Sequence, residues 1–389
     1  MIKYLTSGES HGPQMTVIID GFPAGFNLSL DQINYQLRRR QESLGRGDRM
    51  KIEKDTAEIV SGVRGGVTLG FPITLVIPNL DWPNWANIMN PLQPSGEKAL
   101  DRPRPGHADL PGAVKLGHHD IRNVLERASA RETVARVAAG SLARQFLEKF
   151  GVQFASHVIQ VGKVKLKGAF STRDLAAFAE KVEKSPVRSV DSATGKKMEK
   201  YIKEAAAKRD SLGGAVEVIV RGIPVGLGHF SQWYRRLDSR LAAAVMSIPS
   251  VKAVEIGLGM DSAGSPGSKS QDEIFYAAGS DSAKKDFYRK TNNAGGIEGG
   301  ISNGEDIIVR FAAKPVSTLK KPLRTVNIKT KKPARATVER ADTCIVPVLG
   351  VIGEAAVALV LADAFMEKFG SDNIAEIERN YHRFLGDTF

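Results

Sequence analysis

The amino-acid sequence predicts a single-domain α+β fold, and three observations lead to this prediction. Short runs rich in β-branched residues recur along the 389 residues and are typical of strands. Several of these runs follow one another with no helical pattern between them, which favours antiparallel sheets over a doubly wound parallel sheet. No linker and no internal repeat divides the chain, so we expect a single domain over residues 1–389.

The expected strands are five to fourteen residues long and are rich in β-branched residues. In chain order they cover residues 15–20, 57–63, 73–78, 153–166, 215–221, 253–257 and 306–312.

The expected helices repeat their apolar residues at a period near 3.6. They cover residues 29–41, 120–150, 172–184, 198–208, 232–247 and 352–368. The most apolar stretch, residues 348–365, is interrupted by Glu354 and Asp363, so we expect a buried core helix and no membrane span. The His118-His119-Asp120 group leads into the second helix, because adjacent side chains cannot easily face one ion, and we expect no metal site.

The segment 121–140 contains the most informative pair of residues, Arg127 and Arg131. We expect a continuous helix here, on which Arg122 faces Glu126 and Glu132 faces Arg136 at i,i+4. Arg127 and Arg131 have no such acid and face each other beside the apolar stripe. They therefore require an anion from elsewhere, either a carboxylate of a distant segment or a bound phosphate or carboxylate.

A formal net charge of +12 indicates anionic partners. A nucleic-acid-binding protein is one alternative, but the most basic tract, residues 314–340, contains no aromatic residue on which a base could stack. Another enzyme of phosphorylated acids, such as a phosphotransferase, is a second alternative, although no Walker A loop is present. The single cysteine, Cys344, suits a reducing compartment, and the N-terminus shows no secretory signal, so we expect a cytoplasmic protein.

Four loop clusters combine Gly or Pro with His, Arg or Asp: residues 7–13 (SGESHGP), 38–50 (RRRQESLGRGDRM), 101–112 (DRPRPGHADLPG) and 313–347. Glycines in the first cluster allow close backbone approach to a ligand, and prolines in the third stiffen the loop around Arg104, His107 and Asp109. Three long loops, residues 79–109, 261–272 and 291–304, are candidates for covers over a site. The glycines of the last loop could present backbone N–H groups to an anion.

These segments resemble motifs of the chorismate synthase family in their sequence and in their order along residues 6–370. Two further segments share the resemblance, TNNAGGIEGGISNGEDIIVRFAAKP and ERADTCIVPVLGVIGEAAVALVLADAF. The resemblance implies a single-domain β-α-β sandwich that assembles as a homotetramer. It implies a carbon–oxygen lyase of the shikimate pathway, in aromatic amino acid biosynthesis. The implied reaction is a 1,4-elimination that converts 5-enolpyruvylshikimate 3-phosphate to chorismate plus phosphate with reduced FMN (FMNH2) and no net redox change.

The resemblance also implies the site residues. His11 corresponds to the histidine that protonates the departing phosphate, His107 to the one that protonates the flavin, and Asp342 to a carboxylate that relays the substrate proton. The implied substrate-binding residues are Ser10, Arg40, Arg46, Arg49, Arg104, Arg131 and Arg340. The implied flavin-binding residues are Arg127, Ala128, Ser129, Pro249, Ser250, Gly299, Lys314, Pro315, Val316, Ser317, Thr318 and Arg340.

One departure from the family pattern lies at Pro249 and Ser250, where a Gln or Asn followed by a small residue is more common. Pro249 has neither a backbone N–H nor a side-chain amide, so flavin contacts differ at this point. Because no separate nucleotide-binding region is visible, we expect an external flavin reductase or other reductant, with NADP as the associated nucleotide. We expect no nucleic acid and no membrane among the partners.

Overall fold

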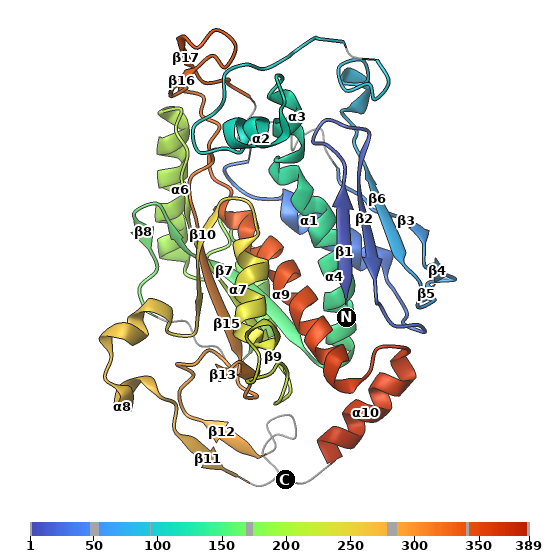
Figure 1. The fold of residues 1–389 in the computed structure, drawn as a ribbon. Coiled ribbons are helices and arrows are strands. Elements are labelled where there is room, and N and C mark those ends of the chain that lie inside the picture. The colour runs from blue at the N-terminus through green and yellow to red at the C-terminus, as the bar shows by residue number, and fades with distance from the viewer. Residues whose placement is uncertain are drawn as a thin grey trace.

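Two antiparallel sheets enclose a layer of helices in the computed structural model, which confirms the predicted α+β class (Figure 1). The structure describes residues 2–46, 54–93, 95–168, 174–277, 286–339 and 342–386. One hydrophobic core runs from Met15 on the first sheet to Tyr381 near the C-terminus and includes the inner faces of both sheets.

The first sheet has the strand order β1 (Lys3–Ser7), β2 (Gln14–Asp20), β6 (Ile73–Pro78) and β3 (Glu58–Ser61). On β2 and β6 every second side chain is buried against the helices, because successive side chains of a strand point to opposite faces. The sequence did not predict β1, because its residues are mostly exposed and show no apolar alternation.

The second sheet has the order β10 (Val251–Ile256), β15 (Ile307–Ala313), β9 (Gly214–Arg221), β7 (Gln153–Val161) and β8 (Val164–Lys165). The predicted strand over residues 153–166 is therefore two strands, joined by a tight turn and paired antiparallel. The other predicted strands of this sheet lie within one or two residues of their expected bounds.

The helix layer consists of α1 (Leu30–Gln41), α4 (Thr133–Lys149), α7 (Leu237–Met246) and α9 (Val346–Phe369). α4 packs on the first sheet and α9 on the second, and the two helices cross at Gly140, where a Cβ would lie 2.4 Å from that of Ala355. α9 is long and apolar enough to span a membrane, but 89% of its most apolar window is buried, so it is the predicted core helix. Its Glu354 is buried between Arg39 and Arg144.

The predicted continuous helix over residues 120–150 is wrong. The chain forms α3 (Arg122–Arg127), a 3-10 turn η3 (Ala130–Glu132) and then α4, with Ser129 extended between them at φ −68° and ψ 142°. The Ser129 hydroxyl accepts a hydrogen bond from the backbone N–H of Arg131, so this serine caps a new turn where the sequence pattern alone predicts continuation. Arg127 and Arg131 consequently do not share one helical face.

The remaining elements are short or peripheral. α6 begins earlier than predicted, because Asp191 caps it, and α2 and α10 were not predicted. Part of the predicted helix 172–184 lies outside the described residues. These elements are β4 (Val63–Arg64), β5 (Val67–Thr68), η2 (Trp82–Asn84), α2 (Asp109–Leu116), α5 (Leu175–Glu183), α6 (Ser192–Ala207), η4 (Trp233–Arg235), η5 (Gly259–Gly264), α8 (Gly267–Ser270), β11 (Ile274–Tyr276), β12 (Phe287–Arg289), β13 (Ile297–Glu298), β14 (Ile301–Ser302), β16 (Arg324–Val326), β17 (Pro333–Arg335) and α10 (Ile374–Gly386).

Candidate active site

A cavity of about 780 Å³ lies beside α3, η3 and the first turns of α9. The loop over residues 79–109 and the segment after β15 complete its walls, near the top of Figure 1. Its lining combines an apolar wall, from Ile248, Val316 and the start of α9, with many charged groups. Among the described residues the cationic lining side chains are Arg40, Arg46, Lys98, Arg104, Arg122, Arg131 and Lys314, and the carboxylates that line it are Glu339 and Asp342.

His11 lies at one side of this cavity and is held by Glu126 of α3. The His11 Nδ1 atom lies 2.9 Å from Glu126 Oε2, and the His11 backbone N–H donates to the same oxygen at 2.8 Å. Arg122 Nη1 donates to the other carboxylate oxygen at 3.0 Å. Burial alone would raise the pKa of the Glu126 carboxyl, but the hydrogen bonds and charge of His11, with the Arg122 bond, hold it below its usual value.

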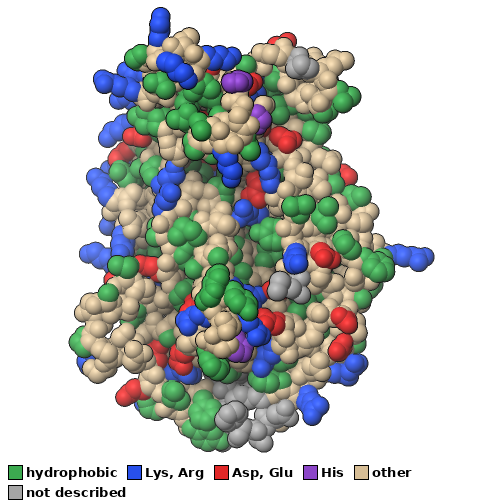
Figure 2. All heavy atoms as spheres, in the orientation of Figure 1, with side chains coloured by type: hydrophobic (Ala, Val, Ile, Leu, Met, Phe, Trp, Pro, Cys, Tyr) green, Lys and Arg blue, Asp and Glu red, His purple; other side chains and the backbone are tan. Residues whose placement is uncertain are grey.

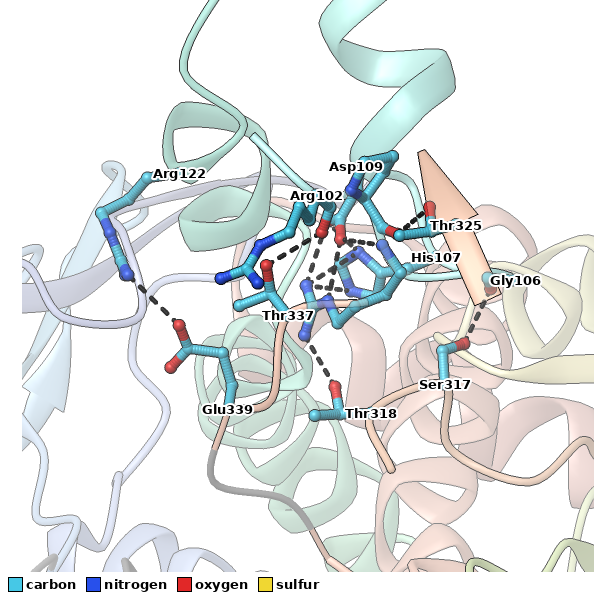
Figure 3. Close-up of polar contacts among 12 residues, drawn as sticks. Arg102, Gly106, His107, Asp109, Arg122, Ser317, Thr318, Thr325, Thr337 and Glu339 are labelled. Atoms are coloured by element: carbon cyan, nitrogen blue, oxygen red, sulfur yellow. Dashed lines mark hydrogen bonds and ion pairs between the residues drawn. The ribbon is translucent and has the colours of Figure 1, made fainter. Parts of the chain in front are cut away.

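His107 lies on the Pro-rich loop and is held by Asp109, at the first residue of α2 (Figure 3). The His107 Nδ1 atom lies 2.6 Å from Asp109 Oδ1, and Arg104 Nε donates to Asp109 Oδ2 at 2.8 Å. Arg104 also donates to the Thr318 hydroxyl at 2.7 Å. Burial would raise the pKa of Asp109, but the His107 and Arg104 hydrogen bonds outweigh it and keep that pKa far below its usual range.

Arg40 and Arg131 share one buried carboxylate, Asp55. Arg40 Nη1 lies 3.3 Å from Asp55 Oδ2, and Arg131 Nη2 lies 3.3 Å from Asp55 Oδ1. All three side chains are almost completely buried. The distant carboxylate considered from the sequence therefore exists, and it pairs with both guanidinium groups.

Arg46 also lines the cavity and pairs with Asp342, at 2.8 Å between Arg46 Nη1 and Asp342 Oδ2. Gly45 permits this arrangement, because at φ +93° it lies so close to the next segment that a Cβ would be 2.9 Å from the carbonyl oxygen of Cys344. The Cys344 thiol is buried, which raises its pKa to about 12. The two other predicted substrate ligands of this region, Arg49 and Arg340, lie outside the described residues.

The predicted flavin residues fall into two groups. Ala128, Ser129, Pro249, Ser250, Lys314, Val316, Ser317 and Thr318 line the cavity. Lys314 Nζ donates to the Ser317 hydroxyl at 3.0 Å, and that hydroxyl donates to the carbonyl of Gly106 at 2.8 Å, which ties this segment to the His107 loop (Figure 3). Ser250 has a positive φ of 76° and accepts a hydrogen bond from the backbone of Lys314.

The second group does not line the cavity in this chain. Pro315 is exposed, and Gly299 lies in the turn between β13 and β14, at the far end of β15 from Lys314. Arg127 is exposed and donates to the Thr6 carbonyl at 2.9 Å and the Gly8 carbonyl at 3.3 Å, so it ties the N-terminal strand to α3. Of the three candidate cover loops, only residues 79–109 contribute lining residues.

Several lining residues were not predicted from the sequence. Trp85 stacks on His11 with ring centroids 3.8 Å apart, and Lys98 Nζ lies 4.1 Å from the Trp85 ring. Arg122 pairs with Glu339 at 3.2 Å (Figure 3), and it also pairs with Glu126. The i,i+4 pairing of Arg122 with Glu126 was predicted, but the sequence gave no sign that this pair borders a site.

The side chains present suit anionic ligands with a flat apolar part. Among the described residues, seven cationic groups and two carboxylates line the cavity, and three more carboxylates, Asp55, Glu126 and Asp109, pair with its arginines. The cavity volume is within the range of small-molecule sites, and its apolar wall could cover a planar ring system. Among the described residues no group of three or more His, Cys, Asp or Glu could hold a metal ion.

Comparison with known proteins gives one consistent result. A family model described as chorismate synthase matches residues 2–366. Chorismate synthase of Geotalea uraniireducens is 52% identical over 393 residues, covering 99% of this chain and 98% of that protein. Chorismate synthase of Bacillus pumilus is 50% identical, covering 98% of each. A crystal structure of chorismate synthase superposes with a TM-score of 0.79 at 39% identity, covering 99% of this chain and 97% of the other.

Proposed function

Because this chain belongs to the chorismate synthase family, we propose that it converts 5-enolpyruvylshikimate 3-phosphate to chorismate and phosphate with the aid of reduced FMN. Family membership itself gives the coarser function, that of a lyase at the last step of the shikimate pathway. The observation that carries the finer proposal is the cavity, in which two carboxylate-bound histidines and seven cations face an apolar wall.

Substrate binding in this proposal depends on the cationic walls. The substrate has a phosphate and two carboxylates, and guanidinium groups bind such anions in bidentate geometry. Arg40 and Arg131, which share Asp55, would bind one anionic group, and Arg46 and Arg104 would bind others. Ser10 lies in the same wall, between His11 and the first sheet, and would donate its hydroxyl.

The elimination breaks the bond between carbon and the phosphate oxygen and removes a proton from C6, so a new C=C bond forms. His11 would deliver a proton to the departing phosphate, whose negative charge the neighbouring arginines would stabilise. The Asp342 carboxylate would take part in carrying the C6 proton, while its partner Arg46 keeps it oriented. The apolar wall would exclude water from the developing charges.

The flavin would occupy the part of the cavity between residues 314–318 and the Ala128–Ser129 bend. Lys314, Ser317 and Thr318 offer donors there, and His107 would hold a proton next to the ring system. Reduced FMN, when bound, would supply electron density and recover it, consistent with a reaction of no net redox change. Pro249 and Ser250 would contact the ring through apolar surface and the Ser250 hydroxyl.

The remaining parts of the proposal concern the whole protein. We propose one domain over the chain, assembled as a homotetramer, in the cytoplasm, with an external reductant that draws on NADPH. Gly299, Arg127 and Pro315, which do not line the cavity of a single chain, would then serve the flavin only through a neighbouring copy or a rearrangement. The basic surface around β16 and β17 in Figure 2 would attract anions without binding nucleic acid.

The decisive experiment is anaerobic release of inorganic phosphate from 5-enolpyruvylshikimate 3-phosphate, with and without reduced FMN. We expect stoichiometric phosphate and chorismate only when reduced FMN is present. Phosphate release that depends on an added nucleotide would indicate a phosphotransferase instead. Absence of any release with reduced FMN would refute the proposed reaction.

A further inference from the structure

Glu126 of α3 makes several hydrogen bonds with the N-terminal loop that contains Ser10 and His11. Its side chain is fully buried, and its two oxygens accept from His11 Nδ1, the His11 backbone N–H and Arg122 Nη1. Its backbone carbonyl also accepts from Ser10 N–H at 3.0 Å. The single residue therefore binds both residues at the tip of the first loop cluster, across 115 positions of sequence.

We propose that Glu126 is a positioning residue that holds His11 with Nδ1 bound and Nε2 as the nitrogen that transfers the proton. This inference rests on the proposed function for the identity of the acceptor, the departing phosphate. A carboxylate that receives Nδ1–H fixes which ring nitrogen serves as the donor and stabilises the cationic form of the ring. Removal of that carboxylate changes both properties of His11.

Trp85 completes the arrangement by fixing the plane of the His11 ring. The two rings are stacked at 3.8 Å with an interplanar angle of 27°. Trp85 is itself anchored, because its Nε1 donates to Asp81 Oδ2 at 3.1 Å. Glu126 restrains the ring within its plane and Trp85 restrains it from one face, so His11 has little rotational freedom left to lose on ligand binding.

Several charged groups among the described residues lie near this histidine. Glu126 contacts it directly, Arg122 lies behind Glu126, and Lys98 and Asp81 contact Trp85, which stacks on it. Arg122 and Lys98 both favour a neutral imidazole, whereas Glu126 is the nearest anion. We therefore expect the Glu126 carboxylate to be the group that chiefly favours the charged form of the His11 ring.

The test compares Glu126→Gln with Glu132→Gln. Glu132 is a matched control, because it too pairs with an arginine at i,i+4, Arg136 at 2.9 Å, and accepts from the N-terminal strand, at Thr6 Oγ1, yet touches no histidine and does not line the cavity. The Ser10 N–H bond to the Glu126 backbone is unaffected by either substitution. Thermal melts establish that both variants are folded.

The first measurement uses the ligand-free protein and is independent of the reaction. A protonated imidazole stacked on an indole quenches its fluorescence, so Trp85 reports on His11 in a Trp82→Phe, Trp233→Phe background. We expect the pH at which quenching is lost to move downward in Glu126→Gln and to stay in place in Glu132→Gln. His11→Ala should abolish the transition. An unchanged transition in Glu126→Gln would overturn the inference even if the enzyme proves to be a chorismate synthase.

The second measurement is turnover with reduced FMN across the pH range. We expect Glu126→Gln to lose about 10- to 100-fold in kcat with KM nearly constant, the loss growing as pH rises, because the uncharged amide no longer favours the charged ring. A loss that is equal at every pH and is restored by Arg122→Met would mean that Glu126 merely neutralises Arg122, and would also overturn the inference. If wild type itself shows no turnover, the proposed function fails and the fluorescence result still decides the role of Glu126.

Discussion

The two histidines of the cavity are held in the same way by different parts of the chain. His107 receives its carboxylate from Asp109, two residues further on, within a loop stiffened by prolines. His11 receives its carboxylate from Glu126, 115 residues further on and on another element. In each case an arginine binds the same carboxylate: Arg104 binds Asp109 and Arg122 binds Glu126.

The difference shows which of the two histidines depends on tertiary structure. The His107 group can keep its geometry as long as its own loop and the start of α2 are folded. The His11 group exists only when the N-terminal loop, α3 and the Trp85 segment pack together. We therefore expect changes near His107 to act locally, and changes near His11 to depend on how the N-terminal strand is attached.

The largest expected effect comes from removing either imidazole. His11→Ala and His107→Ala should each lower turnover by about 10²- to 10⁴-fold, the range for a positioned acid or base. Anaerobic chorismate formation with reduced FMN measures this, with the exposed His119→Ala as control. Wild-type turnover in one of the two variants would show that the two histidines do not have equivalent roles, and it would remove that histidine from the mechanism.

Asp109→Asn should lower the free energy of unfolding more than removal of an exposed carboxylate does. Asp109 is 1% exposed and accepts from the Arg104 guanidinium at two oxygens, so its neutralisation leaves a buried cation without its counter-ion. Disrupting such a pair lowers the free energy of unfolding by about 3 kcal/mol. Urea unfolding measures the loss, and Glu180→Gln, which removes an exposed pair with Lys184, should cost under about 0.5 kcal/mol. Equal losses would mean that the Arg104–Asp109 pair does not stabilise the loop.

The pH dependence of stability distinguishes the two carboxylates further. The folded-state pKa values of Asp109 and Glu126 both lie below those of the unfolded chain. Their stabilisation is therefore complete above about pH 5 and is lost as pH falls through the folded pKa values. Urea midpoints between pH 2 and 7 should fall on acidification in wild type. We expect Asp109→Asn to flatten this decline more than Glu126→Gln does, and the reverse order would contradict the stronger hold on Asp109.

The smallest effect concerns the attachment of the N-terminal strand. Arg127→Ala removes exposed hydrogen bonds to Thr6 and Gly8 and should lower the free energy of unfolding by about 0.5–1 kcal/mol, with turnover changed by less than about threefold. Arg131→Ala, in the cavity wall, should instead weaken substrate binding by about tenfold or more. Calorimetric titration of substrate and FMN checks both variants. A selective loss of FMN affinity in Arg127→Ala would restore its flavin role.

The sequence predicted what depends on local pattern. Most strands of both sheets follow from runs of β-branched residues and the core helix from apolar periodicity, and the Arg104–His107–Asp109 cluster lies within one short segment. Ser10, His11, Arg40 and Arg46 were named as site residues through the resemblance of their glycine-flanked and arginine-dense motifs to the chorismate synthase family, and all four line the cavity.

What the sequence did not predict depends on contacts between distant residues. No spacing rule connects Asp55 to Arg131, Glu126 to His11 or Glu354 to Arg39. The interruption at Ser129 was also missed, because the Ala-rich sequence favours a helix, whereas the Ser129 hydroxyl caps a new turn in the folded chain. The main omission is therefore the set of ion pairs between distant residues.

The buried Cys344 makes this protein convenient for site-specific labelling. It is the single cysteine of the chain, and its thiol remains protonated at neutral pH because burial raises its pKa to about 12. A cysteine introduced at an exposed position of the loop that carries Trp85, such as Leu92→Cys, would be the one reactive thiol for a maleimide dye or a nitroxide. The approach of this loop to the cavity on adding substrate or flavin could then be followed in an otherwise wild-type chain.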